Sequence, residues 1–236
     1  MPDLDGFLAS AYVDPAVFAL RPDYRVVLVA VDGIEPGRGV DLADDLRARA
    51  EASAADALAD VPVTDVPHVA AWRDAYRAFG AKPQRTRNSL ESLMRRAATG
   101  LPRVNPLTDV YNAISVLHRV PLGGEDLARY EGAPRLVRAT GAEPFDTAVD
   151  GETVVEHPEP GEVVWADEAG VTCRRWNWRQ GRRTALTGAT TAAVFILDAL
   201  APMTDDALHA AADDLTAQLR MLGPEVTASR RLIAAD

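Results

Sequence analysis

The chain has 236 residues, of which 47% are hydrophobic, so it can bury a sizeable core as one domain or a fused pair. Acidic residues outnumber basic residues by 35 to 25, and the net charge of -10 excludes a general polyanion-coating protein, which needs an excess of lysine and arginine. The single cysteine excludes an intrachain disulfide, and without a basic leader or a long apolar run we expect a cytoplasmic protein with no membrane contact.

The first 65 residues predict a layer of helices around one strand. Asp14 followed by Pro15 is typical of a helix start, and we expect a short helix over 14–20. The β-branched run at 25–31 predicts a buried strand, and the alanine-rich run at 42–59 predicts an amphipathic helix. We therefore expect residues 1–65 to form an N-terminal helix/strand layer.

Three more helices are expected before residue 120. The first covers 67–79 and is ended by the glycine and proline that follow. Asn88 and Glu91 stand three positions apart, as in a capping box, so the second helix should run over 88–99. The third should run over 107–118, after two prolines.

From Leu122 onward the pattern changes to short strand-like runs separated by turns. Residues 168–170 lie between two such runs and predict a hairpin turn. Thr204 is expected to cap a last helix that ends near 222, followed by a C-terminal tail over 223–236. Helices first and strands later indicate an α+β fold, with one domain over 66–222 around a mixed or antiparallel sheet. The expected strands are 135–140, 162–166, 171–178, 184–187 and 192–197.

Two basic runs interrupt the acidic sequence. Residues 73–103 contain eight basic side chains and two acids, and residues 174–183 contain five arginines and no acid. If the two runs converge, they form a directed anion site; the alternative is that they make ordinary surface pairs with the acidic N-terminal layer. The arginines expected to approach one cleft are Arg85, Arg87, Arg175 and Arg179.

The run 173–179 carries the densest polar chemistry. On a strand, side chains alternate between faces, so Arg175, Asn177 and Arg179 would share one face. Such a row is a poor core surface and a good set of donors for a phosphate, carboxylate or ester oxygen. Trp176 lies on the opposite face, where it either packs in the core or stacks on a base or an aromatic ring.

A second polar group lies at 105–112. Asp109 and Asn112 are three positions apart, so they share one face of a starting helix. This group either caps the helix, through Thr108 or Asp109, or places polar side chains at the mouth of a pocket. The four histidines lack metal-ligand spacing and there is no phosphate loop or nucleophile elbow, so we expect no metal and no cofactor.

Five runs stand out in order along the chain: Arg85–Leu93, Asn105–Asn112, Pro121–Leu127, Gly161–Val164 and Cys173–Arg179. Together they resemble the B3/B4 domain of the bacterial phenylalanyl-tRNA synthetase β subunit, and are still more similar to free-standing proteins built on that domain. The resemblance extends from about residue 72 to about residue 200. It implies a B3/B4-like α+β fold, RNA binding at the acceptor end of aminoacyl-tRNA, and hydrolysis of a mischarged ester, since the synthetase domain hydrolyses tyrosyl-tRNA.

The resemblance also implies roles for single residues. Asp109 and Asn112 look like the Asp-x-x-Asn that precedes the editing pocket. Asp126 looks like the aspartate after the catalytic histidine, and Asp198 like the pocket glutamate shortened by one methylene. The histidine position itself holds Gly123. Because a Trp-Asn-Trp block also replaces the family's glycine-rich turn, a tyrosine specificity is not carried over.

The leading hypothesis is a trans-acting deacylase for mischarged aminoacyl-tRNA. One alternative is a non-catalytic module that binds tRNA or an amino-acid-like ligand, and another is an enzyme acting on a different amino-acid ester or amide. For Asp198, the alternative to a pocket is a strand end that meets water. The expected catalytic residues are Asn112, Arg175, Asn177 and Asp198. The expected substrate-binding residues are Asp109, Gly123, Gly124, Asp126, Trp176 and Arg179, and the expected tRNA-binding residues are Arg85, Arg87 and Arg95.

Overall fold

In the computed structural model of the chain, which describes residues 2–149 and 151–235, the centre is a four-stranded antiparallel sheet. Its inner strands, β2 (Arg25–Asp32) and β10 (Ala192–Ala199), pair over all eight residues of each strand. The outer strands are β3 (Leu122–Asp126), beside β10, and β11 (Thr227–Ala234), beside β2. The inner strands are almost wholly apolar because both of their faces are buried.

Strand alternation divides the core into two clusters on opposite faces of this sheet. The odd-numbered residues of β2 pack against helices, and its even-numbered residues pack toward a second sheet. In β10, Phe195 and Leu197 belong to the helix side, and Ile196 belongs to the other. By the same alternation, Asp198 faces the second sheet together with Ile196.

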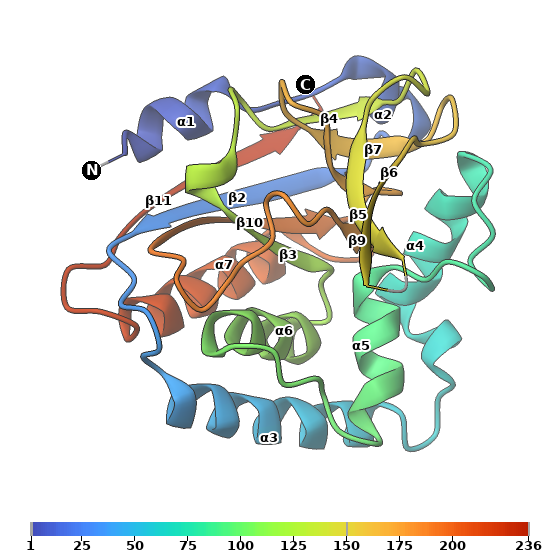
Figure 1. Cartoon of the computed structure of the whole chain (residues 1–236). Coiled ribbons are helices and arrows are strands. Elements are labelled where there is room, and N and C mark those ends of the chain that lie inside the picture. Colours follow the sequence, from blue (N-terminus) through green and yellow to red (C-terminus); the bar gives the residue numbers. More distant parts are fainter. Residues whose placement is uncertain (1, 150, 236) are drawn as a thin grey trace.

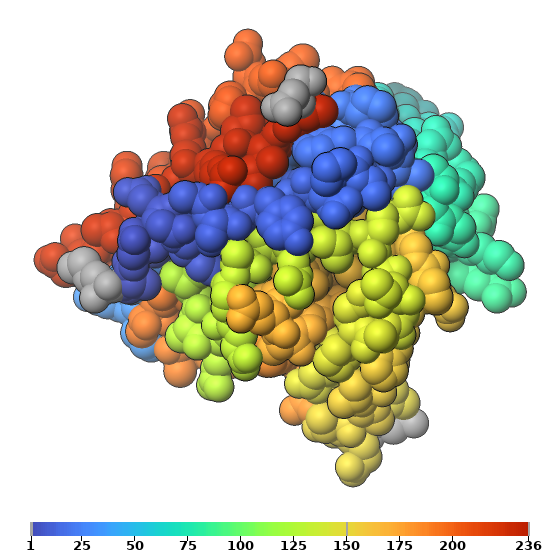
Figure 2. Space-filling model, turned by 90° about the horizontal axis from the view of Figure 1, so that it is seen from above, coloured from blue at the N-terminus to red at the C-terminus, as the bar shows by residue number. Residues whose placement is uncertain are grey.

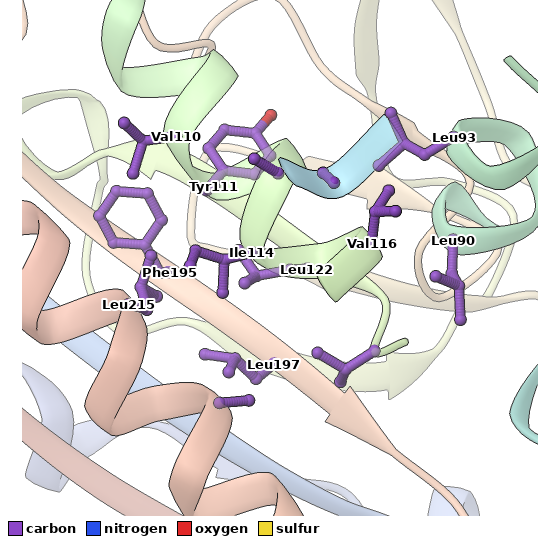
Figure 3. Packing of buried hydrophobic residues seen from close by; sticks show 14 of the residues in the cluster. Leu90, Leu93, Val110, Tyr111, Ile114, Val116, Leu122, Phe195, Leu197 and Leu215 are labelled. Carbon is purple, nitrogen blue, oxygen red and sulfur yellow. The ribbon is translucent and has the colours of Figure 1, made fainter. Parts of the chain in front are cut away.

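Helices cover one face of the four-stranded sheet. Figure 1 shows α3 as the outermost helix, with α6 between it and the sheet. The close view in Figure 3 shows how leucine, isoleucine and phenylalanine side chains from α5, α6, α7, β3 and β10 fill the space between them. The bounds of the covering helices are α3 (Val40–Ala57), α5 (Ser89–Ala97), α6 (Pro106–His118) and α7 (Asp205–Arg220).

The opposite face carries a five-stranded sheet in the order β1-β4-β7-β8-β9, in which β1 and β4 are parallel and the other pairs are antiparallel. A separate hairpin, β5 (Phe145–Val149) with β6 (Glu152–Glu156), projects beside it and forms the yellow lobe in Figure 2. The strands are β1 (Tyr12–Val13), β4 (Arg135–Arg138), β7 (Val163–Ala166), β8 (Val171–Arg174) and β9 (Arg179–Gln180). The remaining helices are α1 (Leu4–Ser10), α2 (Pro15–Leu20), α4 (Pro67–Ala78) and the short 3-10 turns η1 (Val63–Asp65) and η2 (Leu127–Arg129).

The predicted α+β class is confirmed, and so are the helix starts that depend on local capping. The side chains of Asp14, Asn88 and Thr204 accept hydrogen bonds from the first backbone N–H groups of α2, α5 and α7. The cap of α6 is Asn105, which accepts from Thr108 N–H at 2.9 Å. Among the described residues, none of the helices is long and apolar enough to cross a bilayer.

Three expectations need correction. The strand predicted over 171–178 ends at Arg174, because the next two residues have positive φ and turn the chain. Residues 184–187 form no strand and contribute only one bridge, between Ala185 and Glu125. The segment after 222 includes β11, which pairs with β2 along its whole length. The strand expected in the N-terminal layer therefore lies in the middle of the main sheet.

Candidate functional site

A cavity of about 250 Å³ lies where α5 and α6 meet β3, β10 and the turn that follows β8. Its apolar walls include Leu93, Tyr111 and Ile196. The polar groups come from four different parts of the chain, so the fold and not local sequence brings them together. Of the four expected catalytic residues, three line this cavity: Asn112, Asn177 and Asp198.

Asp198 is a carboxyl group with almost no access to solvent, at 2% exposure. The Tyr24 hydroxyl donates to its Oδ1 at 2.6 Å, and the Asn177 amide donates to its Oδ2 at 3.3 Å. Burial raises the pKa of Asp198 to about 7, and these neutral donors offset only part of the effect. No salt bridge joins Asp198 to a cation within the described part of the chain. The carboxyl group therefore lacks the partner that a buried charge requires.

Asn177 is held in place from two helices. The Tyr76 hydroxyl of α4 donates to its Oδ1 at 2.9 Å, and the Ser89 N–H at the start of α5 donates to its carbonyl oxygen at 2.9 Å. The preceding residues, Arg175 and Trp176, have φ of 48° and 68°. Such left-handed backbone costs on the order of 1–3 kcal/mol per residue outside glycine. Trp176 N–H donates to Val163 O at 2.6 Å, so tertiary contacts hold the turn that aims Asn177 at the cavity.

Glu125 is a second buried acid at the cavity, and the sequence analysis did not single it out. It is 1% exposed, it accepts a hydrogen bond from Tyr130 at Oε2, and its Oε1 has no partner among the described residues. Burial raises the pKa of Glu125 to about 7. The signal that points to it is alternation on β3, because Gly123 and Glu125 share one face of that strand.

The two glycines of β3 have different surroundings. Gly123 lines the cavity, where an added Cβ would lie 3.1 Å from the Gln180 amide nitrogen. Gly124 faces the core, where an added Cβ would lie 2.8 Å from Phe195 and 2.9 Å from Leu186. The Gln180 amide donates to the Gly124 carbonyl oxygen at 2.9 Å. The backbone at 123 therefore borders the cavity, whereas 124 is glycine for packing reasons.

Arg175, the fourth expected catalytic residue, does not line the cavity. Its guanidinium lies 3.6 Å from the Glu162 carboxylate and 4.5 Å from the ring centre of Trp178, which is itself a cavity residue. Arg179 lies 3.8 Å from Glu156 and donates to a backbone carbonyl of β5. The shared face expected for these arginines and Asn177 does not form, because β8 ends before them.

Trp176 contributes one edge to the cavity but is chiefly a core residue. It is fully buried, and its ring lies 5.2 Å from Trp72 and 4.9 Å from Tyr24 between ring centres. Asp109 lies outside the cavity and accepts from Val104 N–H at 2.9 Å. Asp126 also lies outside the cavity and accepts from the Thr190 hydroxyl at 2.8 Å. Both aspartates thus have local structural contacts.

Two of the three arginines expected to bind tRNA, Arg87 and Arg95, lie against the buried acid Glu91, and the third, Arg85, does not. Glu91 is 0% exposed and lies 2.9 Å from Arg73, 2.9 Å from Arg95 and 3.8 Å from Arg87. Arg85 is exposed on the loop before α5. The first residue of α5, which follows this loop, contacts the 175–178 turn through the Ser89–Asn177 hydrogen bond, so the two basic runs adjoin there. None of the four arginines expected to approach one cleft lines the cavity itself.

The site offers hydrogen-bond donors and titratable acids rather than a nucleophile. Asn112, Asn177 and Gln180 supply amide groups, and Asp198 and Glu125 change charge near neutral pH. Burial raises the pKa of the Cys173 thiol well above its ordinary value, so this cavity residue is a neutral thiol at pH 7. No cluster of three or more histidine, cysteine, aspartate or glutamate side chains in residues 2–149 and 151–235 has the arrangement of a metal site.

Comparison with known proteins gives one family match. Residues 71–224 match the model of the family described as B3/4 domain. No curated protein matches the chain significantly. Among solved structures, the chain is similar to an N-terminal fragment of the phenylalanyl-tRNA synthetase β subunit from Pyrococcus horikoshii, with 12% identity and a TM-score of 0.46. The similarity covers 94% of this chain and 50% of that chain, so this chain spans about half the length of the fragment.

Proposed function

Since the chain belongs to the B3/4 domain family, we propose that it is a trans-acting hydrolase that removes the amino acid from mischarged aminoacyl-tRNA. The observation that carries the proposal is the convergence of Asn112, Asn177 and Asp198 on one cavity of amino-acid size. These residues lie on α6, on the turn after β8 and on β10, and all three line that cavity. The proposal assigns the protein to the cytoplasm.

Asp198 is the residue proposed to bind the α-ammonium group of the ester. A buried carboxylate without a cation is costly, and an ammonium group supplies the missing charge. Tyr24 and Asn177 already orient the carboxyl group by hydrogen bonds to both oxygens. Binding of the cation favours the carboxylate form and lowers the pKa of Asp198 from its value of about 7.

The proposed chemistry is attack of water on the ester carbonyl carbon. The oxygen of water bonds to that carbon, the carbonyl oxygen becomes an oxyanion, and the bond to the ribose oxygen then breaks. Asn177 keeps one amide N–H beyond the one that it donates to Asp198, and Asn112 offers a second amide, so both are placed to stabilise the oxyanion. Glu125 accepts one proton of the attacking water and then gives this proton to the departing ribose oxygen, so the carboxylate is restored at the end of the reaction.

Glu125 also accounts for how hydrolysis proceeds with Gly123 at the position where the synthetase family has its histidine. Both residues lie on the cavity face of β3, two positions apart. A group with a pKa of about 7 is well matched to proton transfer at neutral pH. Arg175 is proposed to act indirectly, since its cation lies against Trp178 and holds that ring at the cavity wall.

The test is a panel of tRNAs, each charged with a non-cognate amino acid and assayed for deacylation. The parent protein is expected to deacylate at least one member. Asn177→Ala and Glu125→Gln are each expected to lower that rate by about 10²-fold, since loss of an oxyanion donor or a general base typically costs this much or more. Glu125→Gln is also expected to remove the rise of rate with pH near 7. Gln218→Ala, an amide on α7 away from the cavity, is the matched control.

A second candidate is a non-catalytic module that binds tRNA or an amino-acid-like ligand. The observation in its favour is Gly123 at the histidine position. It predicts calorimetric binding of free amino acids or uncharged tRNA with no turnover of any charged tRNA in the panel. Turnover that is lost in Asn177→Ala contradicts this candidate.

A further inference from the structure

The cavity has a cationic rim as well as an acidic floor. Arg96 lines it from α5 and is exposed, whereas Asp198 lines it from β10 and is 2% exposed. Ser89 and Ser92 line the cavity from the same helix, and the spacings of three residues from Ser89 to Ser92 and four from Ser92 to Arg96 place all three along a single stripe. The hydroxyl oxygen of Ser89 is buried and has no hydrogen-bond partner among the described residues.

Arg96 differs from the other arginines near α5. Its neighbour Arg95 and the preceding Arg87 both lie against the buried Glu91 carboxylate. Arg96 makes no salt bridge with any acid in residues 2–149 or 151–235. Its guanidinium is therefore the arginine of this helix that remains available to a ligand at the cavity.

The size of the cavity bears on what lies beside Arg96. About 250 Å³ is below the range of about 300–1,000 Å³ that is usual for pockets which enclose a whole ligand. An amino acid fits in this volume, but an amino acid joined to a nucleoside does not. An acylated nucleotide with its ammonium group at Asp198 must therefore extend beyond the cavity past α5, from which Arg96, Ser92 and the buried Ser89 hydroxyl line it.

We propose that Arg96, Ser89 and Ser92 form an anion subsite that binds the phosphodiester group attached to the terminal nucleoside of an acylated RNA. This subsite deepens the proposed function and rests on it for the identity of the substrate. Guanidinium groups bind phosphate through two parallel N–H donors, and hydroxyl groups add neutral donors. Because the chain has a net charge of -10, one local phosphate contact fits it better than a broad RNA-binding surface.

The experiment compares two esters of the same amino acid: the aminoacyl-tRNA that the protein deacylates, and a 3′-O-aminoacyl adenosine that has no phosphate. Arg96→Ala is expected to lower kcat/KM for the aminoacyl-tRNA by about 10- to 100-fold, the range for loss of a charged hydrogen bond. For the adenosine ester it is expected to change kcat/KM by less than about 2-fold. Arg220→Ala, which removes the same charge from an exposed position on α7, is the control and should affect neither.

A binding measurement separates failure of the subsite from failure of the proposed function. Fluorescence anisotropy of a labelled single-stranded RNA that ends in CCA should show weaker binding to Arg96→Ala and a salt slope smaller by about 0.7, the value for one phosphate contact. An equal loss on both esters, or no loss on either, overturns the subsite. If the parent protein hydrolyses no ester while RNA binding still depends on Arg96, the hydrolase proposal fails and the subsite stands. If the parent protein and Arg96→Ala bind the RNA equally well, the subsite proposal is wrong, whatever the rate of hydrolysis.

Discussion

Buried acids in two regions of this molecule have opposite surroundings. Near α5 and β8, Glu91 and Glu162 are 0% and 3% exposed in their side chains, and each lies within 2.9 Å of an arginine. At the cavity, Asp198 and Glu125 are equally buried but have only neutral donors such as Tyr24 and Tyr130. Arginine side chains neutralise Glu91 and Glu162 within the folded chain. Asp198 and Glu125 have no such cation, so their charged forms are stable only if a cation binds, and otherwise each carboxyl group tends to take up a proton.

This difference separates acids that are paired within the fold from acids that line the candidate site without a cation. Half of the twelve arginines in the two basic runs lie against buried acids: three surround Glu91, Arg174 and Arg175 lie against Glu162, and Arg183 lies against Asp167. Asp198 and Glu125, which are at most 2% exposed and have no cation, line the cavity. A carboxyl group that is almost inaccessible and has no cation thus indicates the candidate site better here than a dense run of arginines.

Glu91→Ala tests whether an arginine-paired buried acid stabilises the fold. Removing this carboxylate leaves Arg73, which is 11% exposed, without its partner, and we expect the free energy of unfolding to fall by about 3 kcal/mol. Urea unfolding at pH 7 measures the change. A loss below about 0.5 kcal/mol would show that water stabilises these arginines as well as Glu91 does, and that the cluster of Glu91 and its arginines has no structural role.

Asp198→Asn tests whether the unpaired cavity acid makes stability depend on pH. Asp198 has a pKa of about 7 in the folded protein and about 3.9 when unfolded, so the folded state binds more protons between these values. Its contribution to stability is therefore fully present below about pH 4 and is lost as pH rises through 7. Between pH 5 and 7, the parent should lose about 2 kcal/mol relative to Asp198→Asn.

Urea unfolding of both proteins at pH 5, 6 and 7 gives this difference. Other groups that titrate in the same range, Glu125 among them, contribute to both proteins and cancel. Parallel pH curves for the parent and Asp198→Asn would mean that Asp198 is ionised throughout, which is the behaviour of a paired acid.

The smallest expected effect comes from Arg87→Ala. This arginine is 47% exposed in its side chain and lies 3.8 Å from Glu91, so solvent screens most of the interaction. We expect the free energy of unfolding to change by less than about 0.5 kcal/mol. Thermal unfolding of Arg87→Ala and Arg73→Ala compares the loss of stability in the two variants. Equal losses would show that the exposed Arg87 stabilises the buried Glu91 carboxylate as much as Arg73 does.

Local signals predicted the helices well because a capping side chain and the backbone N–H that donates to it lie within one turn of each other. Asn88 and Thr204 are examples, and both act as expected. Strands were predicted less well. β3 contains two glycines and two acids, which are typical of a turn, and only its pairing with β10 makes it a strand. β11 is half exposed and has two adjacent arginines before its leucine and isoleucine, so it lacks the apolar run of a central strand.

The candidate site was only partly predictable, because its geometry depends on contacts between segments that are separate in sequence. Asn112 and Asp198 were expected in the pocket from the family resemblance, and Asn177 from the polar run at 173–179; their roles stay predictions. Arg175 was placed by strand alternation, which fails because Arg175 and Trp176 adopt a left-handed backbone that neither residue type favours. That turn depends on the hydrogen bond that Trp176 N–H donates to Val163 O of the neighbouring strand β7, and the residues of the turn themselves give no sign of this contact.

The pairing of β2 has a consequence for how the chain reaches this fold. Residues 25–32 find their two neighbouring strands at 192–199 and 227–234, so the centre of the main sheet closes only across most of the chain length. Contacts of such high sequence separation are slow to form, because loop closure must precede them. On the ribosome, β2 leaves the exit tunnel long before either partner exists. The apolar β2 is therefore the segment most exposed to aggregation during synthesis, and the last strand decides when that exposure ends.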